Sequence, residues 1–227
     1  MKDLFGKAIL DYQTNTSPEN MITSTSISDE DEMEVAYLFR SFAEMPTLEQ
    51  KALQLTKGRT LEVGCGAGSH GLYLQNERNI DVHSIDISEN AIAACTLRGL
   101  KNTQVIDVLN IENEKYDTIL LLMNGIGIAK KKSNLLSFLK NAGEKLNPGG
   151  QIICDSSDVK YLYEDEDGSY WMDLNAEYYG NFKFQMHYKK ISGPEFPWLY
   201  VDYDTLHDIT TQAGFKCQRV FDLDAHF

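Results

Sequence analysis

The chain has 227 residues, of which 42% are hydrophobic and 24% charged, enough to bury a full core and form one globular domain with an added segment. Its formal net charge of −13 would repel a polyanion over most of the surface, so nucleic acid is not expected as a partner. No apolar run reaches the roughly 18 residues of a membrane span, and the four cysteines include no C-x-x-C pair. We therefore expect a cytoplasmic protein that does not bind membranes.

Residues 1–57 predict a helical cap. A short first helix is followed by a polar stretch at residues 13–27, rich in Ser, Thr and Asn, which indicates an exposed loop. Apolar residues then recur at helical spacing over residues 28–42, which predicts a second helix. Another helix is expected to start at Thr47 and to be ended by Gly58.

From residue 58 onward, short apolar segments alternate with helical ones, which is the pattern of βαβ units and a parallel sheet. Residues 58–227 are therefore expected to form an α/β domain with a Rossmann-like, mostly parallel twisted sheet and helices on both faces. The expected strands are residues 60–63, 81–86, 103–107, 117–123 and 151–154, and the expected helices begin near Ser69, Ser88 and Ser133.

After the fifth predicted strand, the sequence pattern changes to one that is typical of additional antiparallel strands. Aromatic side chains are dense over residues 156–200, and every second residue from Phe182 to Tyr188 is bulky and apolar or aromatic, as in a half-exposed antiparallel strand. We expect this segment to form a lid, because amphipathic aromatic side chains suit a small-molecule pocket. A helix that ends at Gly214 and a last strand near residues 215–222 are expected to follow.

The stretch LEVGCGAGSHG at residues 61–71 carries a glycine loop at the end of a predicted strand. It fits G-x-G-x-G from Gly64 and also the dinucleotide pattern G-x-G-x-x-G from Gly66. Val63 is the last clear apolar residue of the strand, so Gly64 is the simpler first glycine. Such glycines permit a positive φ and a close ligand approach, and the free N–H groups of the following helix favour an anion.

An acidic residue closes the next predicted strand. Asp86 ends the stretch IDVHSID, about 20 residues after the glycine loop, where a carboxylate can accept hydrogen bonds from two ribose hydroxyls. A glycine pattern alone is a weak signal, but the strand before it, the helix after it and this carboxylate together indicate an adenosine-containing ligand. The alternative is a tight strand-to-helix turn that binds nothing.

Five motifs in this order resemble the class I S-adenosylmethionine-dependent methyltransferases and, more loosely, small bacterial members of unassigned substrate. The matching stretches are EVGCGAG from Glu62, Asp86 in IDISENAIAAC, Asp107 in VIDVLNI, Asp117 in YDTILLLMNGIG, and LNPGG from Leu146. The resemblance implies that the glycines contact the methionine part of the cofactor, Asp86 the ribose, and Asp107 with Val108 the adenine. The expected cofactor-binding residues are Glu62, Gly64, Cys65, Gly66, Gly68, Asp86, Ile87, Asp107, Val108, Met123 and Asn124.

The resemblance also implies a seventh, antiparallel strand that closes the sheet. The chain stops at Phe227, five residues after the last predicted strand. We therefore expect the seventh strand to be either missing or replaced by an earlier one such as residues 182–190.

Residues after the fourth and fifth strands should face the acceptor, because ligands lie beyond the carboxyl ends of parallel strands. Asn124 either binds a ligand or forms a turn, and Asp155 either has a functional role or caps local structure. In the helical cap expected at residues 1–57, Arg40 either anchors a carboxylate, with Tyr12 nearby, or pairs with a surface acid. His70, on the first helical turn, either reaches the ligand or faces solvent.

The expected reaction is methyl transfer from S-adenosylmethionine to a small-molecule acceptor, with S-adenosylhomocysteine as product. No catalytic residue is assigned, because the sulfonium activates its own leaving group and the protein mainly aligns the acceptor. MNGI after the fourth strand lacks the prolines and the aromatic residue of nucleobase methyltransferases, and neither the isolated histidines nor the acidic run at residues 164–167 has metal-binding spacing. The alternatives are an NAD(P)-dependent oxidoreductase that uses the Gly66 frame and a non-catalytic S-adenosylmethionine-binding protein.

Overall fold

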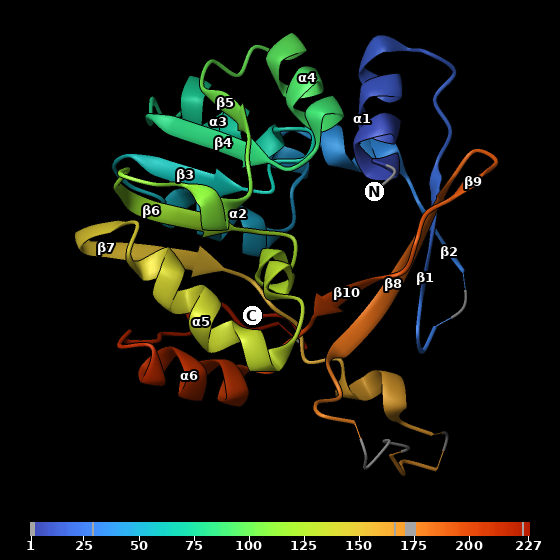
Figure 1. Ribbon diagram of the computed structural model, residues 1–227, viewed down its shortest axis with the longest axis vertical. Helices are drawn as coiled ribbons and strands as arrows, with labels where there is room; N and C mark the ends of the chain where they lie inside the picture. Colours follow the sequence, from blue (N-terminus) through green and yellow to red (C-terminus); the bar gives the residue numbers. More distant parts are fainter. Residues whose placement is uncertain (1–2, 29, 166, 171–175, 224) are drawn as a thin grey trace.

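The computed structural model describes residues 3–28, 30–165, 167–170, 176–223 and 225–227. These described residues form two sheets, one parallel and one antiparallel, that lie side by side (Figure 1). Trp171, in the aromatic-rich segment, lies outside the described residues. Within the described part of the chain, no helix combines the length and the apolar character that crossing a bilayer requires.

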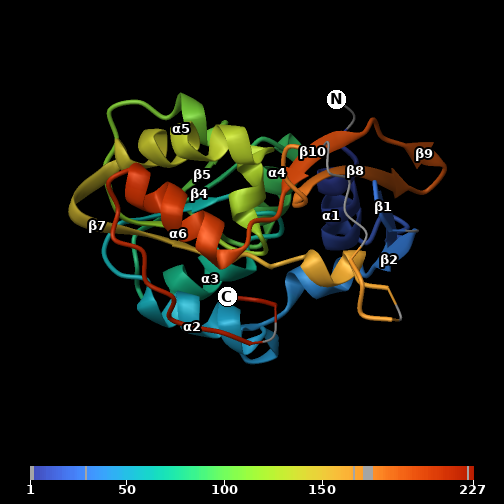
Figure 2. The ribbon, with the colours of Figure 1, turned by 90° about the horizontal axis from the view of Figure 1, so that it is seen from below.

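The parallel sheet has the strand order β5 (Thr103–Val105), β4 (Val82–Asp86), β3 (Thr60–Val63), β6 (Tyr116–Leu121) and β7 (Leu146–Cys154). All four positions of β3 are buried, because helices cover both faces of the sheet. Figure 2 shows α5 (Lys132–Gly143) and α6 (Tyr203–Gln212) on one face and α2 (Thr47–Leu55) and α3 (Ser69–Asn76) on the other. α4 (Glu89–Leu97) lies with the second pair, since Cys95 shares a buried cluster with Leu53 and Leu74. The predicted Rossmann-like fold is confirmed.

Asp117 ties together the amino ends of three strands. Its carboxylate accepts the backbone N–H of Arg59 at 2.8 Å and the side-chain amide of Asn147 at 2.9 Å. Gly58, with a φ of 64°, lies against the same carboxylate, and a Cβ there would collide with it. Gly58 thus serves this contact, while α2 already ends at Leu55. The motifs YDTILLL and LNPGG therefore stabilise the edge of the sheet opposite its carboxyl ends.

The antiparallel sheet combines strands from both halves of the chain. Its strands are β1 (Met21–Thr25), β2 (Asp31–Met33), β8 (Asn181–Tyr188), β9 (Ile191–Ser192) and β10 (Phe196–Leu199), in the order β10-β8-β1-β2 with β9 paired to β8. Met21 lies opposite Tyr188, and Phe196 lies opposite Phe184. Strand alternation gathers such apolar and aromatic side chains on one face, and part of that face packs on α1 (Leu4–Thr14) through Leu4.

The N-terminal section differs from the expected cap in two places. Residues 13–27, expected as a loop, contain β1. Residues 28–42, expected as one helix, form β2 and then two short 3-10 helices, η1 (Val35–Phe39) and η2 (Phe42–Glu44). The helical spacing does mark a buried surface, but Met33 extends in a strand opposite Met21. Pairing with a distant strand outweighs the local pattern here, because β structure depends strongly on tertiary context.

The C-terminal expectations are also corrected. Residues 215–222 are not a strand, and the described residues near the end of the chain form isolated bridges, such as Ser157 with His226. Residues 182–190 do not replace a seventh strand of the parallel sheet, because β8 pairs with β1 and β10. Within the described residues, the parallel sheet has five strands, and the antiparallel sheet is a separate layer beside it.

The predicted helix starts agree in part. Ser88 is the N-cap of α4, and its hydroxyl accepts the N–H of Ala91 at 2.9 Å. α3 begins at Ser69, as expected. α5 begins at Lys132, next to Ser133, as expected, but neither Ser69 nor Ser133 is an N-cap, because the N-caps of α3 and α5 are Gly68 and Lys131.

Candidate active site

The glycine loop connects β3 to the first turn of α3. Gly64, Gly66 and Gly68 have φ values of 71°, 54° and 81°, a left-handed conformation that favours glycine. A Cβ at Gly64 or Gly66 would make ordinary contacts, whereas one at Gly68 would collide with side chains of the α4 region. Gly71, the last glycine of the other frame, lies inside α3 and packs on Glu62. The three positions that need a positive φ are therefore those of the frame that begins at Gly64.

Asp86 lies at the carboxyl end of β4, beside this loop. One carboxylate oxygen accepts the N–H of Gly66 at 3.0 Å and the other that of Ser88 at 2.9 Å. Burial raises the pKa of Asp86 above its ordinary value, although these two hydrogen bonds oppose the rise. Figure 1 shows α1 next to this edge of the sheet, and the side chains of Phe5 and Ile9 are the neighbours that a Cβ at Gly66 would approach.

Glu62 lies beneath the loop. Its side chain is 3% exposed, and it accepts the N–H of Gly71 at 3.2 Å and the hydroxyl of Ser84 at 2.5 Å. Burial raises the pKa of this carboxyl group. Because these bonds connect β3, β4 and α3, Glu62 holds the geometry of the loop from below.

Three further predicted residues lie at the ends of β4 and β5. Ile87 is 74% exposed. Asp107 accepts the N–H of Leu109 at 2.9 Å and so caps the short 3-10 helix η3 (Val108–Asn110). Val108 is buried in the main core cluster. This corner thus offers an exposed apolar side chain beside a carboxylate, at the carboxyl edge of the sheet.

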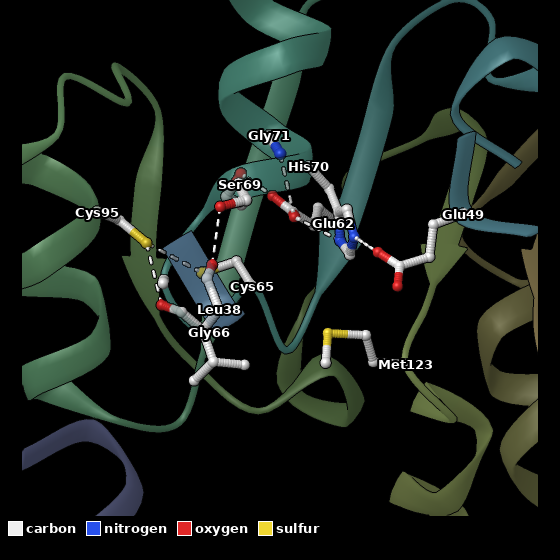
Figure 3. Close-up of polar contacts among 12 residues, drawn as sticks. Leu38, Glu49, Glu62, Cys65, Gly66, Ser69, His70, Gly71, Cys95 and Met123 are labelled. Atoms are coloured by element: carbon white, nitrogen blue, oxygen red, sulfur yellow. Dashed lines mark hydrogen bonds and ion pairs between the residues drawn. The ribbon is translucent and has the colours of Figure 1, made fainter. Parts of the chain in front are cut away.

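Cys65 is buried under the loop (Figure 3). Its sulfur lies 3.7 Å from that of Cys95, and the Cys95 sulfur lies 3.2 Å from the carbonyl oxygen of Gly66. The contact with Cys95 and burial raise the pKa of Cys65 well above its ordinary value, so that it stays a thiol. Its position is that of a small residue that fills the space under the turn.

A network of charged side chains lies on the other side of the start of α3 (Figure 3). The guanidinium of Arg40 pairs with the carboxylate of Glu49 and also donates to the carbonyl oxygen of Tyr37 at 2.6 Å. Glu49 contacts Nε2 of His70 at 2.6 Å, and Nδ1 of His70 lies 3.8 Å from Glu62. Burial opposes the ionisation of Glu49, but its bonds to His70 and Arg40 bring its pKa below the ordinary value. Arg40 therefore pairs with a buried acid of its own chain, and His70 points inward.

The turn after β6 has an uncommon backbone conformation. Met123 and Asn124 have φ values of 58° and 55°, which non-glycine residues seldom adopt and which marks many functional turns. The sulfur of Met123 lies 3.5 Å from Arg40. The side-chain amide of Asn124 donates to the carbonyl oxygen of Leu199 at 3.1 Å, while its amide oxygen is buried and has no hydrogen-bond partner among the described residues.

Asp155 directly follows β7 and lies beside this turn. Both of its carboxylate oxygens accept the backbone N–H of Asn124, each at 3.0 Å. Burial raises the pKa of Asp155 to about 6, with a further rise from the charge of Glu49 and an opposing effect of His70. Burial also raises the pKa of Tyr200, and the nearby charge of Asp155 adds to this.

The aromatic face of the antiparallel sheet adjoins these loops. Phe184 stacks against Phe196 with the ring centroids 6.1 Å apart, and it lies 6.2 Å from Tyr200. Trp198 packs on the 3-10 helix η4 (Gly125–Ala129), where a Cβ at Gly127 would collide with the indole. The rings of Phe184, Phe196, Trp198 and Tyr200 are all half-buried. The aromatic segment thus reaches the carboxyl end of the parallel sheet.

Tyr12 lies apart from the other predicted residues. Its exposed ring packs on Phe39 with a centroid distance of 4.6 Å, and Arg98 lies over the Phe39 ring. Within the described residues it makes no hydrogen bond or ring contact with Arg40. In contrast, Glu49 was not predicted, because in the sequence it is one of several polar residues of a surface-type helix.

A surface hollow of about 900 Å³ lies elsewhere. Lys115, Leu146 and Phe215 contribute to its lining, at the amino end of β7. Ligands of parallel α/β sheets bind at the carboxyl ends of the strands, so this hollow is not the candidate site.

Comparisons with known proteins identify the family. A family described as "Methyltransferase domain" matches residues 61–152. The crystal structure of a SAM-dependent methyltransferase from Bacteroides fragilis, in complex with S-adenosyl-L-homocysteine, is 39% identical, with a TM-score of 0.90 over 99% of this chain and 91% of that chain. No curated protein matches the sequence.

Two more distant structures share the fold. The CcbJ methyltransferase from Streptomyces caelestis is 16% identical and covers 78% of this chain and 82% of its own, with a TM-score of 0.54. A sugar N-methyltransferase from a Streptoalloteichus species is 15% identical and covers 85% of this chain and 89% of its own, also with a TM-score of 0.54. At these identities the likeness concerns the fold alone.

The chain belongs to the S-adenosylmethionine-dependent methyltransferases. It is an enzyme of this class, and its cofactor is S-adenosylmethionine. The oxidoreductase and the non-catalytic binding protein considered above are therefore not retained. Membership of this family agrees with the glycine pattern that the backbone favours, which is G-x-G-x-G beginning at Gly64.

Proposed function

We propose that the enzyme transfers the methyl group of S-adenosylmethionine to a small-molecule acceptor at the carboxyl edge of β3, β4, β6 and β7. The supporting observation is that two added segments are bonded to the loops of this edge. Asp3, which caps α1, accepts the hydroxyl of Ser88 at 2.6 Å, and Asn124 donates to Leu199 of β10 at 3.1 Å. In this proposal residues 1–57 and 156–200 together cover the acceptor, which favours a small molecule over a polymer.

The same proposal assigns the cofactor contacts. The backbone at Gly64 and Gly66 would approach the methionine part, and Asp86 would accept the ribose hydroxyls, since each of its oxygens keeps a lone pair beyond its backbone bond. Ile87 and Asp107 would lie beside the adenine. The residues that would support these groups from below are Glu62, Cys65, Gly68 and Val108.

The acceptor end would be formed by the remaining residues, and this proposal moves Met123 and Asn124, which were predicted from the sequence as cofactor-binding residues, to the acceptor. Met123 and Asn124 follow β6, which adjoins β3, and Asp155 follows β7, which adjoins β6. His70 is connected to Met123 through Glu49 and Arg40. Arg40 already pairs with Glu49, and its buried Nε, which has no partner among the described residues, is the atom left for the carboxylate considered in the sequence analysis. Tyr12 stays a weaker prediction because its ring packs on Phe39.

The bound cofactor supplies a methyl group already activated by the sulfonium. The chain then has to align the acceptor with that methyl group and keep water away. The predicted cytoplasmic location and the predicted lack of nucleic-acid binding stay predictions.

Calorimetry tests the cofactor assignment. We expect micromolar binding of S-adenosylmethionine and S-adenosylhomocysteine, and Asp86→Ala should weaken both by about 1 to 3 kcal/mol because charged hydrogen bonds are lost. Asp81→Ala is the matched control, because this exposed carboxylate precedes the amino end of the same strand. Equal affinities of wild type and Asp86→Ala would remove Asp86 from the site.

A labelling experiment tests the acceptor class. The enzyme and S-adenosylmethionine with a labelled methyl group are incubated separately with small metabolites, with RNA and with protein from one cell extract. We expect label in the small-metabolite fraction. Label confined to RNA or protein would contradict the proposed acceptor class.

A further inference from the structure

Asn124 and Asp155, which both carry side-chain hydrogen-bond acceptors, are bonded to each other just after β6 and β7. Asn124 is 8% exposed, and its amide orientation is fixed because the nitrogen donates to Leu199. The amide oxygen thus faces away from Leu199 without a donor among the described residues. The backbone of the same residue holds Asp155, whose two oxygens each keep a free lone pair.

Asp155 has no ion-pair partner among the described residues, although the charge of His70 acts on it from a distance and lowers its pKa. The nearby cation Arg40 is matched by Glu49, which also engages His70. A buried acceptor without a donor is unfavourable, so a ligand that donates hydrogen bonds and carries positive charge fits this position.

The aromatic face of the antiparallel sheet also favours a positively charged ligand. Tyr200 follows Leu199, whose carbonyl oxygen accepts the side-chain amide of Asn124 at 3.1 Å, and Trp198 packs on the 3-10 helix that follows Asn124. Faces of aromatic rings attract cations and repel anions, because their π electrons carry negative charge. An anionic acceptor would meet both the carboxylate and these rings.

We propose that the methyl acceptor is an amine whose N–H groups are donated to the amide oxygen of Asn124 and to the carboxylate of Asp155. The inference rests on the proposed function. An ammonium group offers three donors and a primary amine two, whereas a hydroxyl offers one and a carboxylate none. Of these groups, an amine therefore matches two neighbouring acceptors best.

The reaction balances with the groups at hand. An ammonium acceptor first releases a proton to Asp155 and onward to water. The nitrogen lone pair then forms the N–C bond with the methyl group, the C–S bond breaks, and its electron pair stays on sulfur. The products are a methylammonium and the neutral thioether S-adenosylhomocysteine. Since burial raises the pKa of Asp155 to about 6, this group can take up and release a proton near neutral pH.

Binding of three matched probes tests the proposal without a known substrate. Phenethylamine, 2-phenylethanol and phenylacetate share one carbon skeleton and differ in the polar group. Their dissociation constants are measured by ligand-observed NMR at pH 7.5 on enzyme saturated with S-adenosylhomocysteine. We expect the amine to bind about tenfold more tightly than the alcohol, and the carboxylate to bind weakest. Equal affinities, a preference for the carboxylate, or no detectable binding of the amine would overturn the proposal.

Two variants test the residues. Asp155→Asn removes the charge at nearly constant shape, and Asn124→Gly removes the amide at a position whose φ of 55° glycine accepts. Each should reduce the affinity for the amine about tenfold and leave that for the alcohol unchanged. Asp81→Asn, at the amino end of β4, should change neither. An amine preference that survives both variants would contradict the assignment of Asn124 and Asp155.

Cofactor affinity separates this inference from the proposed function. S-adenosylhomocysteine should bind both variants within about twofold of wild type. If both variants instead lose affinity for S-adenosylhomocysteine by the same factor as for the amine, Asn124 and Asp155 hold the amino group of the cofactor. The amine inference is then wrong, while the methyltransferase assignment stands. If wild type does not bind S-adenosylhomocysteine, the proposed function itself fails. Methyl groups found on oxygen, sulfur or carbon in the labelled metabolites would also overturn the inference.

Discussion

The two sheets differ in how far along the chain their neighbouring strands lie. In the parallel sheet β3, β4 and β5 follow one another, and Thr60 pairs with Val82. In the antiparallel sheet Met21 pairs with Tyr188, from the other end of the chain. Helices cover both faces of the parallel sheet, whereas the antiparallel sheet packs on α1 through one face. The cofactor edge is thus built from local units, and the proposed acceptor side from a long-range assembly.

Breaking the glycine loop should have the largest effect on stability. Gly68→Ala adds a Cβ that would lie 2.6 Å from Leu100 and 2.8 Å from Cys95, at a φ of 81°. We expect a loss of about 2 to 5 kcal/mol in the free energy of unfolding, from the backbone conformation and from overpacking together. Urea unfolding measures it.

Gly99→Ala is the matched control for this change. Gly99 also has a positive φ, 97°, but a Cβ there meets nothing within 4 Å. Only the backbone term applies, so we expect a loss of about 1 to 2 kcal/mol. Equal losses in the two variants would mean that the contact under the loop does not contribute.

The same contrast explains what the sequence could predict. The parallel sheet and Asp86 at its edge could be located, because each βα unit carries its own apolar run, turn glycine and helix start. β1 and β2 could not, since their residues are polar or helically spaced and become strands only against β8. Glu49 was missed for a related reason: its burial depends on Arg40 and His70, which come from different elements.

Asp155 lies where the two sheets meet, and its charge should cost stability. Its pKa in the folded state, about 6, lies above the ordinary value of 3.8, so the folded state resists ionisation more than the unfolded state does. The full shift corresponds to about 3 kcal/mol, reduced here because the side chain is partly exposed. We expect Asp155→Asn to raise the free energy of unfolding by about 1 to 2 kcal/mol at pH 7.5.

The pH dependence gives the sign of this effect. As pH falls through about 6 toward 4, Asp155 becomes neutral in the folded wild type, so the advantage of Asp155→Asn should shrink. Thermal unfolding of both proteins between pH 5 and 8 measures the difference, with Asp81→Asn as a control whose effect should be small throughout. A variant that is less stable than wild type at pH 7.5 would show that the ionised carboxylate is needed to hold the Asn124 turn.

The smallest expected effect on stability comes from a contact between the antiparallel sheet and α1. The hydroxyl of Tyr188, a residue that is 2% exposed, donates to Asp11 of α1 at 3.0 Å. Burial opposes the ionisation of Asp11, but its bonds to Lys7, Lys189 and Tyr188 bring its pKa below the ordinary value. Tyr188→Phe removes one of these donors, so we expect a loss of about 1 kcal/mol at neutral pH. The loss should diminish only below the ordinary Asp pKa, as pH falls through the lowered pKa of Asp11 and its carboxylate is protonated in the folded state.

Hydrogen exchange decides whether this loss is local. If the antiparallel sheet opens as its own unit, Tyr188→Phe should reduce the protection of the β1 and β8 amides about fivefold and leave those of β3 and β6 unchanged. Tyr163→Phe, which removes a hydroxyl bond to the carbonyl oxygen of Tyr179 outside both sheets, should leave all four strands unchanged. An equal loss of protection in β3 and β6 would mean that the two sheets unfold together. The contacts through α1 and β10 would then couple the sheets more strongly than their separate hydrogen-bonding patterns suggest.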